Sequence, residues 1–255
     1  MTNYLPTCKQ SGAGPSVLFL HGLGGNRHAF DHQLNHLSGH YHCVAWDTPG
    51  YGDSMPMPEM SFEALAASVD NLIDQLGIEP YAVVGHSMGG MIAQTWLRQG
   101  GRAQKLVLAQ SSARFGKPGS EWNQKFLAAR RKPLDQGQKP ADFARSLIES
   151  MLHDPGNLAA IESGVATMAP LPAQVYRQVI ECLITFDETA SLQHIDIPTL
   201  CLAAQYDTTA PAENVEKMAQ AIPHARYLCL PDAGHLAYIE TPQAFSAALA
   251  EFLGT

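Results

Sequence analysis

The sequence is poor in charge and in aromatic residues, and it has no long apolar run. Charged residues make up 16% and aromatic residues 8% of the 255 residues, whereas hydrophobic residues make up 45%. The 24 acidic side chains outnumber the 16 basic ones, which gives a net charge of −8. Without a basic excess the surface does not attract nucleic acid or anionic lipid, so neither is expected as a partner. No run approaches the roughly 18 apolar residues of a membrane span, so no membrane association is expected.

Cysteine is also scarce, and its spacing follows no known pattern. The five cysteines are odd in number and far apart, with neither C-x-x-C pairs nor zinc-type Cys/His spacing. We expect reduced, mostly buried thiols and no metal site. The opening MTNYLPTCKQ has neither a basic start nor an apolar signal core, which predicts a cytoplasmic protein. The cysteines are Cys8, Cys43, Cys182, Cys201 and Cys229.

Short apolar runs alternate with helical patterns along most of the chain. The runs do not alternate polar and apolar residues, which is typical of strands buried on both faces of a parallel sheet. Alternation of such strands with helices predicts an α/β fold with a mostly parallel, doubly wound sheet. Helices are expected over 27–37, 61–76, 88–98 and 242–253. The predicted strands begin at Ser16, Tyr41, Tyr81, Lys105, Pro198 and Arg226.

One stretch, residues 114–192, interrupts this alternation. It has no convincing strand and carries several amphipathic helical patterns that prolines divide. We interpret it as a helical insertion between the fourth and fifth parallel strands, within a core formed by residues 1–113 and 193–255. In such sheets ligands bind at the C-terminal ends of the strands, so the insertion is expected to act as a lid over the site.

The strongest chemical signal is VVGHSMGGMIAQ, in which Gly85, Ser87 and Gly89 form G-x-S-x-G between a strand and a helix. A sharp turn at this point strains the serine backbone, and only small neighbours let the strand and the helix pass closely. Ser87 Oγ would then stand above the sheet, at a helix N-terminus that favours negative charge. We therefore predict that Ser87 is a nucleophile.

A serine hydroxyl needs a base to take its proton and a carboxylate to orient that base. Asp207 follows one predicted strand and His235 follows the next, in the segments QYDTTAP and DAGHLAYIETP. Along the chain, Ser87 is followed by Asp207 and then by His235, which is the order that accompanies this strand–turn–helix motif. Asp232 is the alternative acid, but it lies three residues from His235 and more plausibly shapes the turn.

The developing oxyanion would need preorganised N–H donors. Met88, directly after the nucleophile, is expected to supply one backbone N–H, and Leu23 in the loop LFLHGLGGN the other. Two neighbouring histidines have plainer interpretations. His86 is expected to face away from Ser87 Oγ and serve in packing or in a supporting hydrogen bond, and His21 to brace the Leu23 loop.

Further residues carry weaker hypotheses. Trp122, Phe126, Met151 and Tyr238 are candidate substrate-binding residues, although apolar residues at helical spacing are usually core. His28, His32, His36 and His40 recur every four residues, which puts at least the first three on one face of the predicted helix. They lack the glutamate of an H-E-x-x-H zinc motif, so we interpret them as a partly exposed face that gains charge below about pH 6.5.

Taken together, LFLHGLGG, WDTPGYGDS, GHSMGG, the Asp207 loop and DAGH resemble the α/β-hydrolase superfamily in order and over nearly the whole chain. GHSMGGMIAQ and GHLAYIETP are similar to 3-oxoadipate enol-lactonases and small carboxylesterases. Two features depart from these patterns. The region before Ser16 is short for the usual pair of opening strands, which predicts a smaller sheet, and His21 is often absent from such enol-lactonases.

The sequence thus predicts a serine hydrolase that cleaves a small, fairly apolar ester or lactone through an acyl-enzyme on Ser87, without a cofactor. A carbon–carbon hydrolase of ring-cleavage products is one alternative. A resemblance to that group would imply Trp directly after the histidine, but this chain has Leu236 there. A small-molecule receptor with little turnover is another, since this fold also hosts receptors. The expected partner is a small-molecule substrate, and the chain is expected to be a monomer or a homodimer.

Overall fold

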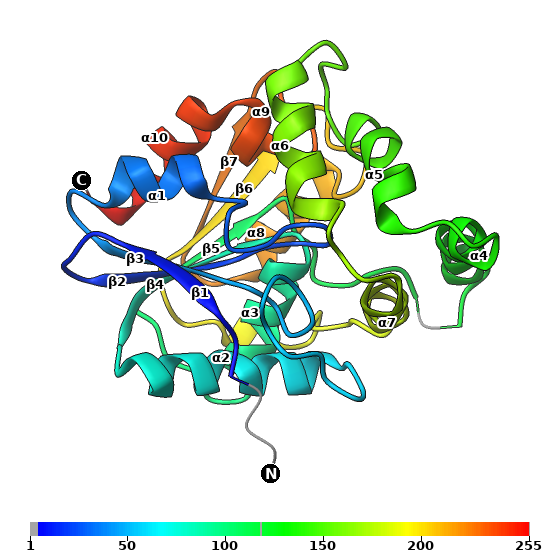
Figure 1. Cartoon of the computed structure of the whole chain (residues 1–255). Helices are drawn as coiled ribbons and strands as arrows, with labels where there is room; N and C mark the ends of the chain where they lie inside the picture. The colour runs from blue at the N-terminus through cyan, green and yellow to red at the C-terminus, as the bar shows by residue number, and fades with distance from the viewer. Residues whose placement is uncertain (1–4, 118, 255) are drawn as a thin grey trace.

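The computed structural model describes residues 5–117 and 119–254. Within them, one sheet of seven strands has the order β1-β3-β2-β4-β5-β6-β7 (Figure 1). All neighbours pair in parallel except β1 and β3, which are antiparallel. The strands are β1 (Cys8–Ser11), β2 (Ser16–Leu20), β3 (His42–Trp46), β4 (Pro80–His86), β5 (Lys105–Ala109), β6 (Thr199–Ala204) and β7 (Ala225–Leu230). The α/β fold and the mostly parallel sheet predicted from the sequence are confirmed.

The inner strands are buried along all or nearly all of their length, as expected for strands covered on both faces. Every residue of β2 and β6 is buried, whereas β7, at one edge, exposes three of its residues. At the other edge, the region before Ser16 contributes the short strand β1, in which Cys8 pairs with Trp46. That region therefore supplies one described strand in place of the usual opening pair.

Helices cover both faces of the sheet. Figure 1 shows α1 and α10 on one face and α2 and α3 on the other. Ser61 caps α2 by accepting the Ala64 N–H at 3.1 Å, and Gly77 ends this helix in the left-handed conformation at φ 60°. These helices are α1 (Asp31–Leu37), α2 (Phe62–Leu76), α3 (Met88–Arg98), α8 (Ala212–Ala221), α9 (Ala237–Glu240) and α10 (Pro242–Leu253).

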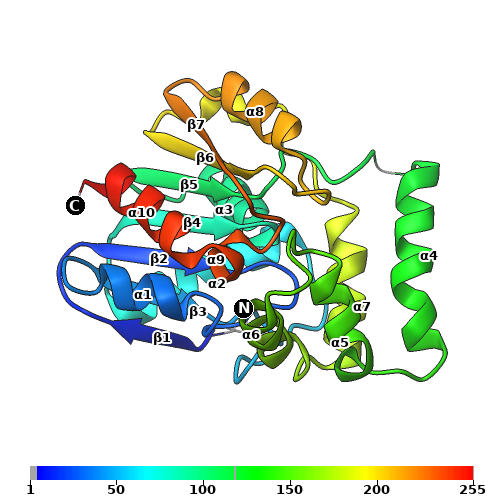
Figure 2. The ribbon, with the colours of Figure 1, turned by 90° about the horizontal axis from the view of Figure 1, so that it is seen from above.

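In the described part of segment 114–192, four α-helices lie between β5 and β6, and the strand-like pairing found there is the isolated bridge between Arg114 and Asp187. Figure 2 shows them together at one end of the sheet, with α4 outermost. Where this segment leaves and rejoins the core, its ends run side by side: the Phe115 N–H donates to the Phe186 carbonyl at 3.0 Å, and the Glu188 N–H donates to the Ala113 carbonyl at 2.8 Å. The helices are α4 (Glu121–Asp135), α5 (Pro140–Glu149), α6 (Leu158–Met168) and α7 (Ala173–Leu183).

These helices contact loops that follow the C-terminal ends of the strands. A Cβ added to Gly24, after β2, would lie 3.2 Å from Met168 of α6. A Cβ added to Gly50, after β3, would lie 2.9 Å from Val175 of α7. Both glycines have positive φ, at 81° and 89°, so a side chain there would be strained by conformation and also crowded.

The predicted helix over 27–37 is shorter than expected, because α1 begins only at Asp31. Before it, the Arg27 N–H donates to the buried carboxylate of Asp47 at 2.7 Å, a tertiary contact that holds the chain in turns. The prediction that His28, His32 and His36 share one face of this helix is therefore wrong in part, since His28 precedes the helix. The His28 Nδ1 lies 3.4 Å from Asp31 Oδ2. His32 instead bonds Ser246 at 3.1 Å.

Membrane-spanning helices and metal-binding clusters are both absent from the described residues. None of the helices in 5–117 and 119–254 combines the length and apolar character needed to cross a bilayer. Over the same residues, no group of three or more His, Cys, Asp or Glu side chains is arranged to hold a metal ion. The five cysteines are free thiols, and three of them are buried.

Candidate active site

Ser87 lies in a sharp turn between the end of β4 and the start of α3. Its backbone has φ 51° and ψ −118°, a region that non-glycine residues rarely occupy. The turn is held from both sides, because the Ser87 N–H donates to the Ala109 carbonyl at 2.9 Å and its own carbonyl accepts the Ser111 hydroxyl at 2.8 Å. Ser87 itself is half-buried.

The glycines on either side of the turn are needed because backbones approach closely there. A Cβ on Gly85 would lie 2.5 Å from the Gly90 Cα, and one on Gly89 would lie 1.9 Å from the Leu20 carbonyl oxygen. The loop after β2 also comes close to the serine, since a Cβ on Gly22 would lie 2.9 Å from the Ser87 Cβ. The structure thus brings the loop that carries Leu23 against Ser87.

Ser87, His235 and Asp207 form one hydrogen-bonded chain. His235 Nε2 lies 3.0 Å from Ser87 Oγ, and His235 Nδ1 lies 2.8 Å from Asp207 Oδ2. Because an ionised carboxylate only accepts hydrogen bonds, Nδ1 carries the proton and Nε2 presents its lone pair to the serine hydroxyl. His235 and Asp207 are 4% and 5% exposed, so this pair works away from bulk water. The three predicted side chains therefore meet.

Asp207 is fixed by its own loop after β6. Its Oδ1 accepts the N–H groups of Thr209 and Ala210, both at 2.8 Å, which leaves Oδ2 to face His235. The alternative acid, Asp232, is not the residue bonded to His235. It has φ 52° and shapes the turn between β7 and His235, as expected.

The two other histidines near the serine have the supporting positions expected of them. His86 Nε2 donates to the His235 carbonyl at 2.8 Å. His21 Nε2 accepts the Thr48 N–H at 3.1 Å, so its Nδ1 carries the proton and donates to the Gly22 carbonyl at 2.8 Å. Burial disfavours the charged ring and lowers the pKa of His21 to about 4, and burial also lowers the pKa of His86 well below its usual value.

The four candidate substrate-binding residues lie in different surroundings. Trp122 and Phe126 stack on one another on α4, with ring centroids 5.6 Å apart and Trp122 53% exposed. Met151 follows α5, and its carbonyl accepts the His235 N–H at 2.8 Å. Tyr238 is buried beneath the site, where its ring meets that of His86 at 4.7 Å. Its position is that of a packing residue beside His86.

Two supporting residues were not singled out from the sequence. Ser111 holds the carbonyl of the nucleophile, and Thr48 fixes His21 with both its N–H and its hydroxyl, the latter at 3.2 Å. Hydroxyl residues are common in loops, and each of these acts on a segment distant in the chain. The one available signal is their position just after predicted strands.

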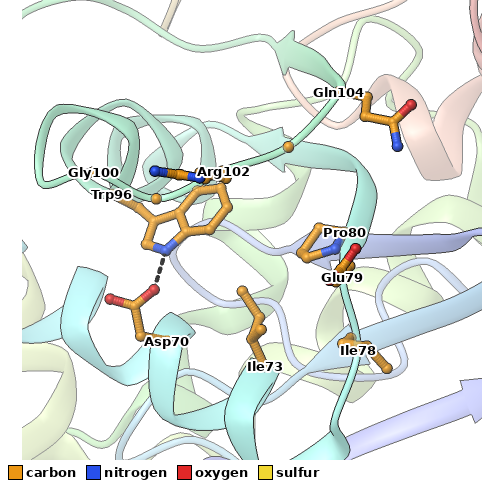
Figure 3. A pocket seen from close by; sticks show the side chains of 11 residues that line it. Asp70, Ile73, Ile78, Glu79, Pro80, Trp96, Gly100, Arg102 and Gln104 are labelled. Atoms are coloured by element: carbon orange, nitrogen blue, oxygen red, sulfur yellow. Dashed lines mark hydrogen bonds between the residues drawn. The ribbon is translucent and has the colours of Figure 1, made fainter.

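A cavity of about 420 Å³ lies at the opposite end of the sheet from Ser87 (Figure 3). Pro80, at the start of β4, and Gln104, just before β5, are among its lining residues, whereas Ser87 follows the other end of β4. The Trp96 indole N–H donates to Asp70 at 2.6 Å in its wall. This cavity contains none of the predicted site residues.

Comparisons with known proteins identify similar hydrolases. The 3-oxoadipate enol-lactonase 1 of Acinetobacter baylyi is 29% identical, over 91% of this chain and 85% of the enzyme. The structure of a hydrolase from Pseudomonas aeruginosa is 30% identical with a TM-score of 0.86, covering 97% of this chain and 94% of that one. A thermophilic esterase from Thermogutta terrifontis is 26% identical with a TM-score of 0.86, covering 97% and 92%. The family model of the alpha/beta hydrolase fold matches residues 15–242, so the chain belongs to the α/β hydrolase fold family.

Proposed function

We propose that the protein is a serine hydrolase that cleaves a small, fairly apolar carboxylic ester or lactone. The observation that carries the proposal is the 3.0 Å approach of His235 Nε2 to Ser87 Oγ, with Asp207 behind the imidazole. A nucleophile within hydrogen-bond reach of an oriented base is the arrangement that acyl transfer requires. The enol-lactonase and esterase relatives support the same class of substrate.

In the proposed mechanism, Ser87 Oγ attacks the carbonyl carbon while His235 Nε2 takes its proton. Asp207 stabilises the imidazolium that forms, and His235 then gives the proton to the leaving oxygen, which leaves an acyl group on Ser87. Water attacks this ester with the same base. The N–H of Met88, which has no partner within α3 because it opens that helix, and the N–H of Leu23 are proposed to hold the oxyanion.

The helical segment 114–192 is proposed to act as the lid. Met168 and Val175 come from this segment and contact the glycine loops after β2 and β3, and we propose that they form an apolar roof above the serine. Trp122, Phe126 and Met151 are the proposed substrate contacts from the same segment. An apolar roof favours an acyl group without charge, because burying an unpaired charge is costly.

The test is steady-state hydrolysis of p-nitrophenyl esters from acetate to decanoate, with Ser87→Ala beside the wild type. We expect turnover that falls with chain length, and a loss of at least about 10⁴-fold in Ser87→Ala. Ser38→Ala is the matched control, since that hydroxyl donates to the Asn35 carbonyl near the end of α1. Unchanged turnover in Ser87→Ala would refute the proposal.

The same assay separates the alternatives. If the esters are not turned over but a fluorophosphonate still labels Ser87, the result favours a lactone substrate or one of the two alternatives, a carbon–carbon hydrolase or a receptor. A dienoate ring-cleavage product would then be consumed by the first, whereas the second would be stabilised by its ligand without multiple turnover.

A further inference from the structure

Glu240, at the end of α9, has a buried carboxylate that the proposed mechanism does not use. The residue is 8% exposed, and in the part of the chain that the structure describes no basic side chain forms an ion pair with it. Its two oxygens instead accept two backbone N–H groups: Oε2 that of Gly234 at 2.6 Å, and Oε1 that of Asp154 at 2.7 Å. These charge-assisted bonds offset the cost of burying the carboxylate.

The two N–H groups belong to segments far apart in the chain. Gly234 directly precedes His235, whereas Asp154 lies in the α5–α6 loop, residues 150–157. The same loop accepts the His235 N–H through the Met151 carbonyl at 2.8 Å. A Cβ on Gly234 would lie 2.5 Å from that carbonyl oxygen, so the two segments are in contact. Glu240 therefore bridges the α5–α6 loop and the segment that carries the base.

The α5–α6 loop also contacts the segment that carries the acid. The ring of His153 stacks on that of Tyr206, with centroids 3.6 Å apart and planes 7° from parallel. Tyr206 directly precedes Asp207. The α5–α6 loop thus contacts both the segment that carries Asp207 and the segment that carries His235. The Glu240 carboxylate links this loop to the His235 segment.

We propose that Glu240 is a positioning residue, which holds the His235 backbone and the α5–α6 loop together so that His235 Nε2 stays within reach of Ser87 Oγ. This inference rests on the proposed function. An ionised carboxylate accepts at both oxygens, whereas the amide of a glutamine accepts at one and presents N–H to the other donor. Glu240→Gln would therefore release one of the two segments without changing the size of the side chain.

The experiment compares Glu240→Gln with Glu188→Gln. Glu188 is an equally buried carboxylate, 5% exposed, that accepts from Arg98 and Ser191 where the helical segment rejoins the core, so it is the matched control. We expect Glu240→Gln to lower kcat for p-nitrophenyl acetate about 10- to 100-fold with KM within about twofold, because a small misplacement of a base costs rate more than binding. Labelling of Ser87 by a fluorophosphonate should slow by the same factor.

Glu188→Gln should lower the melting temperature and leave kcat and labelling unchanged. If Glu240→Gln lowers the melting temperature as Glu188→Gln does but leaves kcat unchanged, the residue is only structural and the inference is wrong. If Glu240→Gln does not fold, kcat is measured for Glu240→Asp instead. Its shorter carboxylate keeps the charge and reaches only one of the two N–H groups. An intermediate loss of kcat supports the inference, and wild-type kcat overturns it.

A readout without substrate separates this inference from the proposed function. The His235 Nδ1–H that bonds Asp207 should give a low-field proton resonance in the wild type and in Glu188→Gln, but a broadened one in Glu240→Gln. If no ester is cleaved and no serine is labelled, the proposed function fails while the resonance still tests the positioning role. An unchanged resonance in Glu240→Gln would overturn that role.

Discussion

The buried, neutral imidazole of His21 should make the fold sensitive to acid. His21 is 1% exposed, and burial lowers its pKa to about 4. In the unfolded chain the same ring has a pKa of about 6.5. The unfolded state therefore binds the proton first, so the stability that the neutral ring provides is complete above about pH 6.5 and is lost as the pH falls toward 4.

The size of the loss follows from the two pKa values. Lowering the pH from neutral to about 5 should reduce the free energy of unfolding by about 2 kcal/mol through this ring. Lowering it to about 4 should reduce that free energy by about 3 kcal/mol. That is a substantial fraction of the 5–15 kcal/mol roughly typical of a folded protein. Protonation also breaks a specific contact, because a charged His21 can no longer accept the Thr48 N–H.

Urea unfolding of the wild type and of His21→Gln, followed by circular dichroism across this pH range, measures the effect. The variant should be less stable at neutral pH, and its free energy of unfolding should fall about 3 kcal/mol less on acidification, because glutamine does not titrate. His40→Gln, at an exposed position, should follow the wild type. Parallel pH curves for wild type and His21→Gln would refute the reasoning.

Two further predictions concern the nucleophile turn and the acid. Gly89→Ala should destabilise the protein by roughly 3 kcal/mol or prevent folding, because its Cβ would lie 1.9 Å from the Leu20 carbonyl oxygen. Gly39→Ala is the control in thermal unfolding, and it should be nearly neutral because the space around Gly39 is open. Asp207→Asn should lower kcat for p-nitrophenyl acetate by about 10⁴-fold while preserving the fold, because the amide favours the wrong tautomer of His235; a kcat within tenfold of wild type would contradict it.

Local signals in the sequence predicted the parts of the site that local structure determines. The strand–turn–helix pattern around Ser87 gave α3 with the bounds that the structure shows, since glycines and a buried apolar strand act within a few residues. The order of Asp207 and His235 after two strands placed them correctly, because parallel strands end at the same edge of a sheet.

Other features depend on contacts between distant segments. Strand β1, with the sequence CKQS, is short and largely polar, so it has no apolar periodicity, and it exists because it pairs with β3. The late start of α1 follows from the Arg27 N–H bond to Asp47. The acceptor role of Glu240 depends on Gly234 and Asp154, which only the folded chain brings together.

The meeting of the two ends of segment 114–192 has a consequence for how the protein can be altered. Arg114 and Asp187 form an antiparallel bridge, so the chain leaves and returns at one place, while β5 and β6 pair directly across the gap, as Leu106 does with Thr199. Because a short turn can join ends that already lie together, helices of this segment can be exchanged without disturbing the strand register, provided that the α5–α6 loop keeps its contacts with Gly234 and His235. Arg114–Asp187 is thus a natural graft point, at which recognition of new substrates can be introduced while the sheet stays unchanged.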